Sequence, residues 1–511
     1  MGGSILGEIL AAKRRRIAAG EFTAATGAAA AAAAATAFPP AKPDGARFAA
    51  ALRASSLSKK SPSSSFLCEI KHRSPSAGLL LADLDVRFEA VARAYRRGGA
   101  AALSVVIEQD FFGGDPVMLP RAKVASGLPV LMKDFVVDES QLDFAAALGA
   151  DAVLLIAAVL GDADLARLHA AAKARGLAVL VEAHDESEVR RVAVVGAEIV
   201  GVNSRDLATF AVDLAGMARL GALLPEKAVR VAESGIRSRA DVEALEAAGY
   251  AACLVGERLL RSPDPARTLR ELRGESATEV KICGVTREED VDACLECGVD
   301  WIGLIFAARS PRCLTPEKGR LLGMRARGEG DRGFLRMKDV GEGGARRAGG
   351  GAAGRASGAV KGVVAVFDGG DEEEILRVIA HVRPDVVQMP DPPLTLQKKF
   401  LSSSLPLWNT VRVGRDDFAG VGNRAGSALH FDTSVAGASG GTGKTFDWSV
   451  LDVVERTRPL VLAGGLTPAN VAEAVRRVRP DVVDVASGVE SSPGVKDPAK
   501  IAAFVREVRR A

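Results

Sequence analysis

The feature of this sequence that most constrains its fold is the alternation of short apolar runs with segments of helical periodicity. In the first half the runs fall at 66–70, 102–106, 129–132, 152–156, 178–181, 199–202, 229–232 and 252–255. In the second half they fall at 280–282, 301–306, 362–367, 386–388, 405–413, 428–431, 460–462 and 482–485. Such alternation is typical of βα units around a parallel sheet. Eight units in each half predict an α/β protein made of two tandem (β/α)8 TIM barrels.

The length of 511 residues suits two large domains better than one. We place the first domain at residues 1–272 and the second at 279–511. An alanine-rich segment at about 23–45 is expected to be a helical or frayed insertion in the first domain. A segment at about 325–357 is dominated by Gly, Arg and Ala, cannot bury a core, and is predicted to be a disordered insertion in the second domain.

The composition is that of a soluble globular protein, with 48% hydrophobic and 26% charged residues. Lysine and arginine number 67 against 64 acids, so the charge gives no reason to expect a nucleic acid or a membrane as partner. The six cysteines are scattered singly, which indicates a reducing compartment. Residues 5–17 have helical periodicity and an acid, unlike a signal or transit peptide. We therefore expect the cytoplasm, and a plastid remains open.

Polar side chains gather where the predicted strands of the first half end. Residues two apart share a face of a strand, so Glu69 and Lys71 converge at the end of the first run. A simple ion pair capped by a turn is the alternative for these two residues alone. The other ends carry Glu108, Lys133, Asp134, Phe135, Glu182, Asn203, Ser204, Arg205, Glu233, Ser234, Gly235, Gly256 and Glu257. Barrel enzymes place their chemistry at these ends, and glycines at the seventh and eighth ends often hold phosphate, so a phosphorylated substrate is predicted.

Five segments of the first half resemble indole-3-glycerol-phosphate synthase in order and spacing, over roughly residues 4–272. They are 69–76, 129–135, 180–185, 201–207 and 231–236. That family cyclises a carboxyphenylamino-deoxyribulose phosphate to indole glycerol phosphate with loss of carbon dioxide and water. The resemblance implies that Lys133 is the general acid and Glu182 the opposing carboxylate, while Glu69 and Lys71 orient or assist the dehydration.

The same resemblance implies the remaining site residues of the first half. The further catalytic residues are Asn203 and Glu233. The residues for substrate and phosphate are Ser74, Phe112, Phe135, Arg205, Ser234, Gly235, Gly256 and Glu257. Ile107 stands where the family has a threonine before Glu108, and we expect tuning there.

The strand ends of the second half carry a different set, which comprises Lys281, Cys283, Arg309, Arg312, Asp432, Gly464, Gly465, Asp484, Ser487 and Gly488. A cysteine followed by glycine is open to a ligand, and its thiolate can act as a base; a small buried hydrophobe is the alternative. Residues 438–445 fit the loosest phosphate-loop pattern but do not lead directly into a helix, so nucleotide binding is not expected. Cys294 and Cys297 lack a second ligand pair, so no metal is expected there.

Segments 281–286, 310–312, 440–448, 462–468 and 485–497 resemble phosphoribosylanthranilate isomerase, over roughly residues 279–511. That family catalyses an Amadori rearrangement, in which an acid protonates the furanose ring oxygen and a base removes a proton from the adjacent carbon. The resemblance implies that Asp432 is the acid, Cys283 the base and Arg312 a substrate anchor. It implies phosphate binding by Gly464, Gly465, Ser487 and Gly488. The family has a histidine where this chain has Pro390, and the Gly/Arg-rich insertion is a second departure.

The two resemblances together predict a bifunctional enzyme of tryptophan biosynthesis. The second barrel would convert N-(5-phosphoribosyl)anthranilate to 1-(2-carboxyphenylamino)-1-deoxyribulose 5-phosphate, which the first would convert to indole-3-glycerol phosphate. The alternative is an active synthase whose second barrel is a structural or ligand-binding partner. We expect no cofactor and no metal. The expected partners are small phosphorylated substrates and other enzymes of the tryptophan pathway, not a nucleic acid or a membrane.

Overall fold

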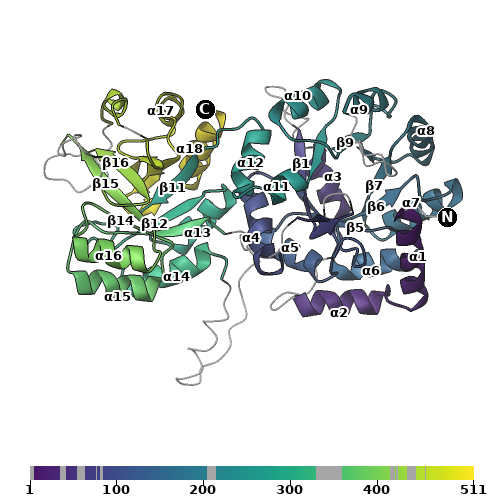
Figure 1. Cartoon of the computed structure of the whole chain (residues 1–511), viewed down its shortest axis with the longest axis horizontal. Helices are drawn as coiled ribbons and strands as arrows, with labels where there is room; N and C mark the ends of the chain where they lie inside the picture. Colours follow the sequence, from purple (N-terminus) through teal and green to yellow (C-terminus); the bar gives the residue numbers. More distant parts are fainter. Residues whose placement is uncertain are drawn as a thin grey trace, which may run out of the picture. The chain divides into compact units, whose positions relative to one another are not determined.

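The computed structural model describes residues 5–34, 42–53, 64–75, 78–80, 84–203, 214–329, 359–414, 421, 424–433, 445–454 and 456–511. The chain divides into two compact units, Met1–Gly274 and Glu275–Ala511. Each unit contains a closed barrel of eight parallel strands surrounded by helices (Figure 1). The predicted fold class, two tandem (β/α)8 barrels, is confirmed.

The strands of the first barrel agree with the predicted runs to within two residues at each end. They are β1 (Ser65–Ile70), β4 (Ala102–Val106), β5 (Val130–Lys133), β6 (Ala152–Ile156), β7 (Ala178–Ala183), β8 (Ile199–Asn203), β9 (Val229–Glu233) and β10 (Ala252–Val255). The helices that follow them are α4 (Leu84–Arg97), α5 (Met118–Ser126), α6 (Ser140–Leu148), α7 (Asp162–Ala174), α8 (Glu186–Val195), α9 (Leu214–Gly221), α10 (Arg239–Ala247), α11 (Glu257–Leu260) and α12 (Pro265–Leu272). β1 pairs with both β4 and β10, and this closes the ring.

The two-residue period of each strand separates two apolar cores in the first barrel. Phe66 and Cys68 of β1 face outward and pack in the core shared with the surrounding helices. Leu67 faces inward and belongs to a second cluster, which fills the barrel. The residue two positions beyond an inward apolar residue therefore also points inward, at the carboxyl end of the barrel.

Among the residues described before the first barrel, three helices form: α1 (Ile5–Ala18), α2 (Ala24–Ala34) and α3 (Gly45–Arg53). The alanine-rich segment was expected to be a helical or frayed insertion, and over 24–34 it is a helix packed against α6 (Figure 1). The packing is close, because a Cβ on Gly27 would lie 2.5 Å from the carbonyl oxygen of Phe144. Helix α3 buries Phe48 and Leu52 in the cluster that fills the barrel. The alanine-rich helix is thus part of the folded unit.

The second barrel is built in the same way. Its strands are β11 (Glu279–Cys283), β12 (Trp301–Ile305), β13 (Gly362–Val366), β14 (Val386–Met389), β15 (Leu407–Val413), β16 (Ala428–Thr433), β17 (Leu460–Leu462) and β18 (Val482–Val485). Its helices are α13 (Glu288–Glu296), α14 (Pro316–Ala326), α15 (Glu372–Val382), α16 (Leu394–Ser402), α17 (Val471–Val478) and α18 (Pro498–Arg510), with short 3-10 helices at Trp448–Leu451 and Ser487–Val489. After β18 a small hairpin forms from β19 (Glu490–Ser492) and β20 (Val495–Lys496).

The first residues of the predicted Gly/Arg-rich insertion are helical. Arg325 belongs to α14, and its guanidinium lies 2.6 Å from Asp292 and 2.9 Å from Glu288. These ion pairs fix the end of the helix to the preceding one. Residues 330–358, which hold most of the predicted insertion, lie outside the described residues. Within the described part of the chain, no helix is long and apolar enough to cross a membrane.

Candidate active sites of the two barrels

Four strands of the first barrel bring charged side chains to one place. In each strand the charged residue stands two positions after an inward apolar residue, so it continues the inward face at the carboxyl end. The four residues are Glu69 on β1, Lys133 on β5, Glu182 on β7 and Glu233 on β9. The predicted acid and carboxylates of the first half therefore meet, as the strand-end pattern requires.

Lys133 is the centre of this cluster. Its Nζ lies 2.8 Å from Glu233 Oε2, 3.5 Å from Glu69 Oε2 and 3.9 Å from Glu182 Oε2. The ammonium of Lys71 lies 2.5 Å from Glu69 Oε1. Three carboxylates and two ammonium groups thus share a largely buried space.

The pKa values of the cluster follow from these contacts. Burial acts to lower the pKa of Lys133, but the three carboxylates outweigh it and hold the pKa well above the usual value. For Glu69, burial acts to raise the pKa, but Lys71 and Lys133 lower it overall. Burial and the nearby charge of Glu182 raise the pKa of Glu233 to about 7 despite Lys133. At neutral pH the site therefore holds a charged lysine beside a carboxyl group poised to exchange a proton.

His184 joins the cluster although the sequence analysis assigned it no role. Its Nε2 lies 3.1 Å from Glu182 Oε1, and its Nδ1 lies 3.1 Å from Glu188 Oε2 on α8. Asn203 donates from Nδ2 to the same Glu182 oxygen at 3.1 Å. Burial acts to lower the pKa of His184, but the two carboxylates raise it to about 10. The two-residue spacing from Glu182 was the signal that could have identified this residue.

Two glycines leave room for the carboxylates. A Cβ on Gly201 would lie 2.0 Å from Glu233 Oε1, and a Cβ on Gly256 would lie 2.9 Å from Glu69 Oε1.

The residues predicted to bind phosphate after β9 have an unusual backbone. Ser234 and Gly235 have φ angles of 69° and 78°, so two successive residues are left-handed where phosphate binding was predicted. Glu257 lies 3.1 Å from Arg261, the residue that follows α11, and its substrate role stays a prediction.

Glu108 does not join the lysine cluster by any recorded contact among the described residues. Its carboxylate accepts backbone N–H groups from Asp110, Phe111 and Phe112 at 2.8 to 3.2 Å, so it shapes the loop after β4. The rings of Phe112 and Phe135, both predicted to bind substrate, lie 6.3 Å apart. Glu108 therefore positions one member of this aromatic pair.

Two other predicted residues stand apart from this geometry. Ser74 is buried in a short antiparallel pair formed by β2 (Arg73–Ser74) and β3 (Gly78–Leu79). Arg205, with Ser204, lies outside the described residues. Their predicted roles stay predictions.

Helix α1 is tied to the same end of the barrel. Lys13 Nζ lies 2.8 Å from Asp134, and both side chains are at most 1% exposed. Asp134 in turn accepts the backbone N–H of Phe135 at 2.8 Å. Lys13 therefore fixes the residues on either side of this aspartate, Lys133 and Phe135, and the sequence analysis gave it no role.

The second barrel places its predicted base against a buried lysine. Lys281 and Cys283 are both inward residues of β11, and the Lys281 ammonium acts to lower the pKa of the Cys283 thiol. Lys281 Nζ lies 2.6 Å from Asp484 Oδ2 and donates to Gln388 Oε1 at 2.8 Å. Gly303 on β12 leaves the necessary space, because a Cβ there would lie 2.9 Å from the Cys283 sulfur.

The predicted acid, Asp432, follows His430 by two residues on β16. His430 Nε2 lies 2.9 Å from Asp484 Oδ2, and its Nδ1 lies 3.3 Å from the Thr410 hydroxyl. Burial, with the charge of Asp484, raises the pKa of Asp432, which favours the protonated form that an acid requires. Burial also raises the pKa of Cys283, so the resting site contains a thiol and not the thiolate that a base requires.

Arg312, the predicted substrate anchor, is already engaged. Its guanidinium makes two hydrogen bonds to Glu490, at 2.7 and 2.6 Å. Lys496 lies 2.8 Å from the same carboxylate. A Cβ on Gly284 would lie 2.4 Å from the Arg312 side chain, which places this arginine beside the residue after Cys283. The sequence analysis missed Glu490 and Lys496.

The residues predicted to bind phosphate in the second barrel lie at the ends of β17 and β18, which are neighbouring strands. They are Gly464, Gly465, Ser487 and Gly488. A Cβ on Gly464 would lie 2.1 Å from the hydroxyl of Thr433, the residue after Asp432. Residues 438–444 of the phosphate-loop-like segment lie outside the described residues.

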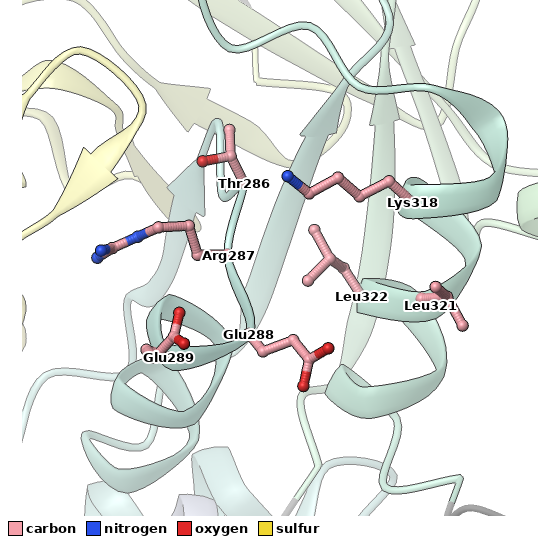
Figure 2. Close-up of a pocket in the computed structure, with 7 residues that line it drawn as sticks. All are labelled: Thr286, Arg287, Glu288, Glu289, Lys318, Leu321 and Leu322. Atoms are coloured by element: carbon pink, nitrogen blue, oxygen red, sulfur yellow. The ribbon is translucent and has the colours of Figure 1, made fainter. Parts of the chain in front are cut away.

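A separate surface hollow of about 330 Å³ lies outside the second barrel, between the starts of α13 and α14. Figure 2 shows the residues that line it, which are Thr286, Arg287, Glu288, Glu289, Lys318, Leu321 and Leu322. The lining mixes two cations with two acids, and Arg287 pairs with Asp290 at 2.5 Å. This mixture favours neither an anion nor a cation, and the hollow includes neither Cys283 nor Asp432.

Comparison with known proteins matches both halves. The family of indole-3-glycerol phosphate synthase matches residues 6–272, and the family of N-(5'-phosphoribosyl)anthranilate isomerase matches residues 352–507. A tryptophan biosynthesis protein of Phytophthora nicotianae is 33% identical, over 82% of this chain and 86% of that protein. A multifunctional tryptophan biosynthesis protein of Schizosaccharomyces pombe is 33% identical, over 87% of this chain and 59% of that protein. An indole-3-glycerol phosphate synthase of Streptomyces coelicolor is 48% identical, over 46% of this chain and 87% of that protein.

Proposed function

This chain belongs to the bifunctional indole-3-glycerol phosphate synthase and phosphoribosylanthranilate isomerase family of tryptophan biosynthesis, and on that premise we propose which residues perform each reaction. Its substrates are small phosphorylated molecules. We assign the synthase reaction to residues 1–272 and the isomerase reaction to residues 279–511. The observation that carries the assignment is the Lys133 ammonium within 4 Å of three carboxylates, because cyclisation requires an acid and a base that face each other.

In the first barrel, Lys133 is the general acid that protonates the substrate carbonyl as the aromatic carbon attacks it. Its raised pKa keeps the proton in place until the developing charge on the carbonyl oxygen draws it away. Glu182, held by Asn203 and His184, is the opposing carboxylate, and the Glu69–Lys71 pair assists the dehydration.

The remaining predicted residues of the first barrel bind the substrate. The left-handed backbone at Ser234 and Gly235 directs amide groups to where phosphate is bound, with Gly256 on the neighbouring strand end. Phe112 and Phe135 hold the aromatic ring of the substrate. Ser74, Arg205 and Glu257 complete the substrate contacts.

In the second barrel, Asp432 protonates the furanose ring oxygen and Cys283 takes the proton from the adjacent carbon. The raised pKa of Asp432 suits the first step. The second step needs a thiolate, and the Lys281 ammonium helps to stabilise one, because it acts to lower the pKa of Cys283. Arg312 binds the substrate, and Gly464, Gly465, Ser487 and Gly488 bind its phosphate.

A second barrel without catalysis is the competing hypothesis, and its sequence support is Pro390 together with the Gly/Arg-rich insertion. Gln388, two residues earlier on the same inward face, is hydrogen-bonded to Lys281 at 2.8 Å. The strand thus still contributes to the polar interior beneath Cys283. This contact favours an active isomerase.

The variant Lys133→Met tests the synthase assignment. With the carboxyphenylamino-deoxyribulose phosphate supplied directly, we expect synthase turnover to fall by about 10²- to 10⁴-fold, because the acid is lost. Lys173→Met is the matched control, since Lys173 is half-exposed and pairs with Glu198 on the surface. Isomerase turnover should be unchanged in both variants. Unaffected synthase turnover in Lys133→Met would show that the acid is assigned wrongly.

A further inference from the structure

The second barrel has a polar layer directly beneath Cys283 and Asp432. The inward residues one step deeper along five strands are Lys281, Gln388, Thr410, His430 and Asp484, and each is at most 8% exposed. Branched apolar side chains normally fill such layers, and burying an ion pair costs more than an apolar replacement. The layer therefore serves a purpose other than filling the barrel.

One oxygen atom connects the two sides of this layer. Asp484 Oδ2 receives the Lys281 ammonium at 2.6 Å and His430 Nε2 at 2.9 Å. Lys281 stands two residues before Cys283 on the inward face of β11, and His430 stands two residues before Asp432 on the inward face of β16. The assigned base and the assigned acid thus each have a neighbour that binds the same carboxylate oxygen.

The imidazole of His430 is fixed at both nitrogens. The carboxylate of Asp484 is an acceptor, so Nε2 of His430 carries the hydrogen that it donates. Nδ1 lies 3.3 Å from the Thr410 hydroxyl on the neighbouring strand. No rotation of the ring keeps both contacts, so the orientation of His430 is determined by the barrel.

We propose that His430 is a positioning residue of the isomerase site, which acts through the shared Asp484 oxygen to balance the charge felt by Cys283 and Asp432. The inference rests on the proposed assignment of these two residues as base and acid. In the reaction, negative charge leaves the sulfur as it gains a proton and appears on Asp432 as that residue gives one up. The carboxylate of Asp484 is partly neutralised by Lys281 on one side and by His430 on the other. It therefore opposes negative charge on Cys283 and on Asp432 only weakly.

The direction of the effect follows from the charge of Asp484. This charge raises the pKa of Cys283 and of Asp432, while Lys281 lowers both and His430 lowers that of Asp432. The hydrogen bond from His430 also lowers the pKa of Asp484 itself. Without that donor, both reacting groups experience more of the negative charge. The other charged neighbours of Cys283, Lys496 among them, stay in place.

The test compares His430→Leu with His430→Gln in the full chain. Leucine removes the donor, so the two limbs of the isomerase pH profile, measured as kcat/KM with phosphoribosylanthranilate, should both move to higher pH by about half to one unit. Glutamine can donate to Asp484 and accept from Thr410, so its profile should stay close to that of the unmodified protein. A residue with a merely structural role would lower kcat without moving the limbs.

Three results overturn the inference: unshifted limbs in His430→Leu, a shift to lower pH, or a His430→Gln variant that behaves like the leucine variant. Folding is checked by tryptophan fluorescence. If the leucine variant does not fold, Thr410→Val decides instead, with a smaller shift in the same direction expected and an unshifted profile contradicting the proposal. Failure of the acid and base assignment is distinguished separately, because Cys283→Ser would then retain isomerase activity.

Discussion

The two barrels share a fold but place their charges at different depths. In the first, inward residues such as Leu131 and Leu180 fill the interior with apolar side chains, and charge begins one step later, at Lys133 and Glu182. In the second, the apolar interior cluster is smaller, and a buried lysine already stands at Lys281, one step below Cys283. The first site is a charged mouth on an apolar barrel, whereas the second extends into the barrel.

This difference determines how a substitution acts. The lysines at the mouth are partly exposed, at 19% for Lys71 and 17% for Lys133, so water reaches the carboxylates beside them more readily once such a charge is removed. A charge inside the barrel leaves an unpaired buried partner, which costs more in stability. Activity and stability should therefore separate more readily for the lysines of the first site than for the buried charges of the second.

The largest expected effect is the loss of one activity at a time. Asp432→Asn should lower isomerase turnover by about 10²- to 10⁴-fold and leave the synthase reaction on supplied intermediate unchanged. Asp452→Asn, an exposed aspartate in the same barrel, is the control. Mixing Asp432→Asn protein with Lys133→Met protein should restore the overall conversion, because each supplies the barrel that the other lacks. A mixture without product formation would contradict separate sites.

The next largest effect concerns the buried ion pair of Lys13 and Asp134, which joins α1 to the residue after Lys133. Lys13→Met leaves the carboxylate of Asp134 buried without its partner, so the first barrel should lose about 3–5 kcal/mol of stability. All three tryptophans lie in the second barrel and both tyrosines in the first, so urea unfolding followed by each chromophore separates the two units. In Lys13→Met, only the unfolding transition followed by tyrosine should shift to a lower urea concentration.

Arg14→Met is the matched control for Lys13→Met, because Arg14 is exposed on the same helix. Its effect should stay within about 0.5 kcal/mol. Equal effects of the two variants would show that the pair with Asp134 does not anchor α1. The double variant Lys13→Met with Asp134→Asn should recover part of the loss.

A smaller effect is the pH-dependent contribution of His184 to the stability of the first barrel. The pKa of His184 is raised to about 10 in the folded chain, so its stabilising contribution is complete below pH 6.5 and is lost as the pH rises through 10. His184→Ala should therefore cost about 1.5–3 kcal/mol at pH 6.5 and much less at pH 10. Arg190→Gln, an exposed residue of α8, should show no such trend. A pH-independent cost for His184→Ala would contradict the ion pairs with Glu182 and Glu188.

The strand-end pattern was sufficient to predict the first site because its charges lie where inward faces leave the barrel. Glu69, Lys133, Glu182 and Glu233 come together through the two-residue period alone. Lys281 and His430 were harder to interpret, because an inward polar residue inside a strand has meaning only when its cross-barrel partner is known. Asp484 is that partner, and it is about 200 residues from Lys281 in sequence.

The pattern of strand ends also does not predict contacts between a barrel and the helices that precede it. The pair of Lys13 with Asp134 joins residues 121 positions apart, and neither period nor spacing indicates it. Composition left the alanine-rich segment open between a packed and a frayed helix, because alanine allows two helices to approach closely as readily as it allows a helix to fray. The contact of Gly27 with Phe144 depends on that close approach.

The smallest expected effect tests the packing of that alanine-rich helix. Gly27→Ala improves helix propensity, but its Cβ would meet the Phe144 carbonyl oxygen at 2.5 Å, so we expect a net loss of about 1 kcal/mol in the first barrel. Ala28→Gly, on the exposed side of α2, measures how much an exchange of alanine and glycine changes stability through helix propensity alone. A stabilising Gly27→Ala would mean that α2 is not packed against α6.

The most direct test of the central claim supplies the full chain with phosphoribosylanthranilate alone, while anthranilate fluorescence is followed and the products are resolved. If each barrel performs its assigned reaction, the substrate disappears and indole-3-glycerol phosphate accumulates without added intermediate. Unchanged substrate, in a preparation that still converts supplied carboxyphenylamino-deoxyribulose phosphate, would contradict the account and leave the second barrel without catalysis.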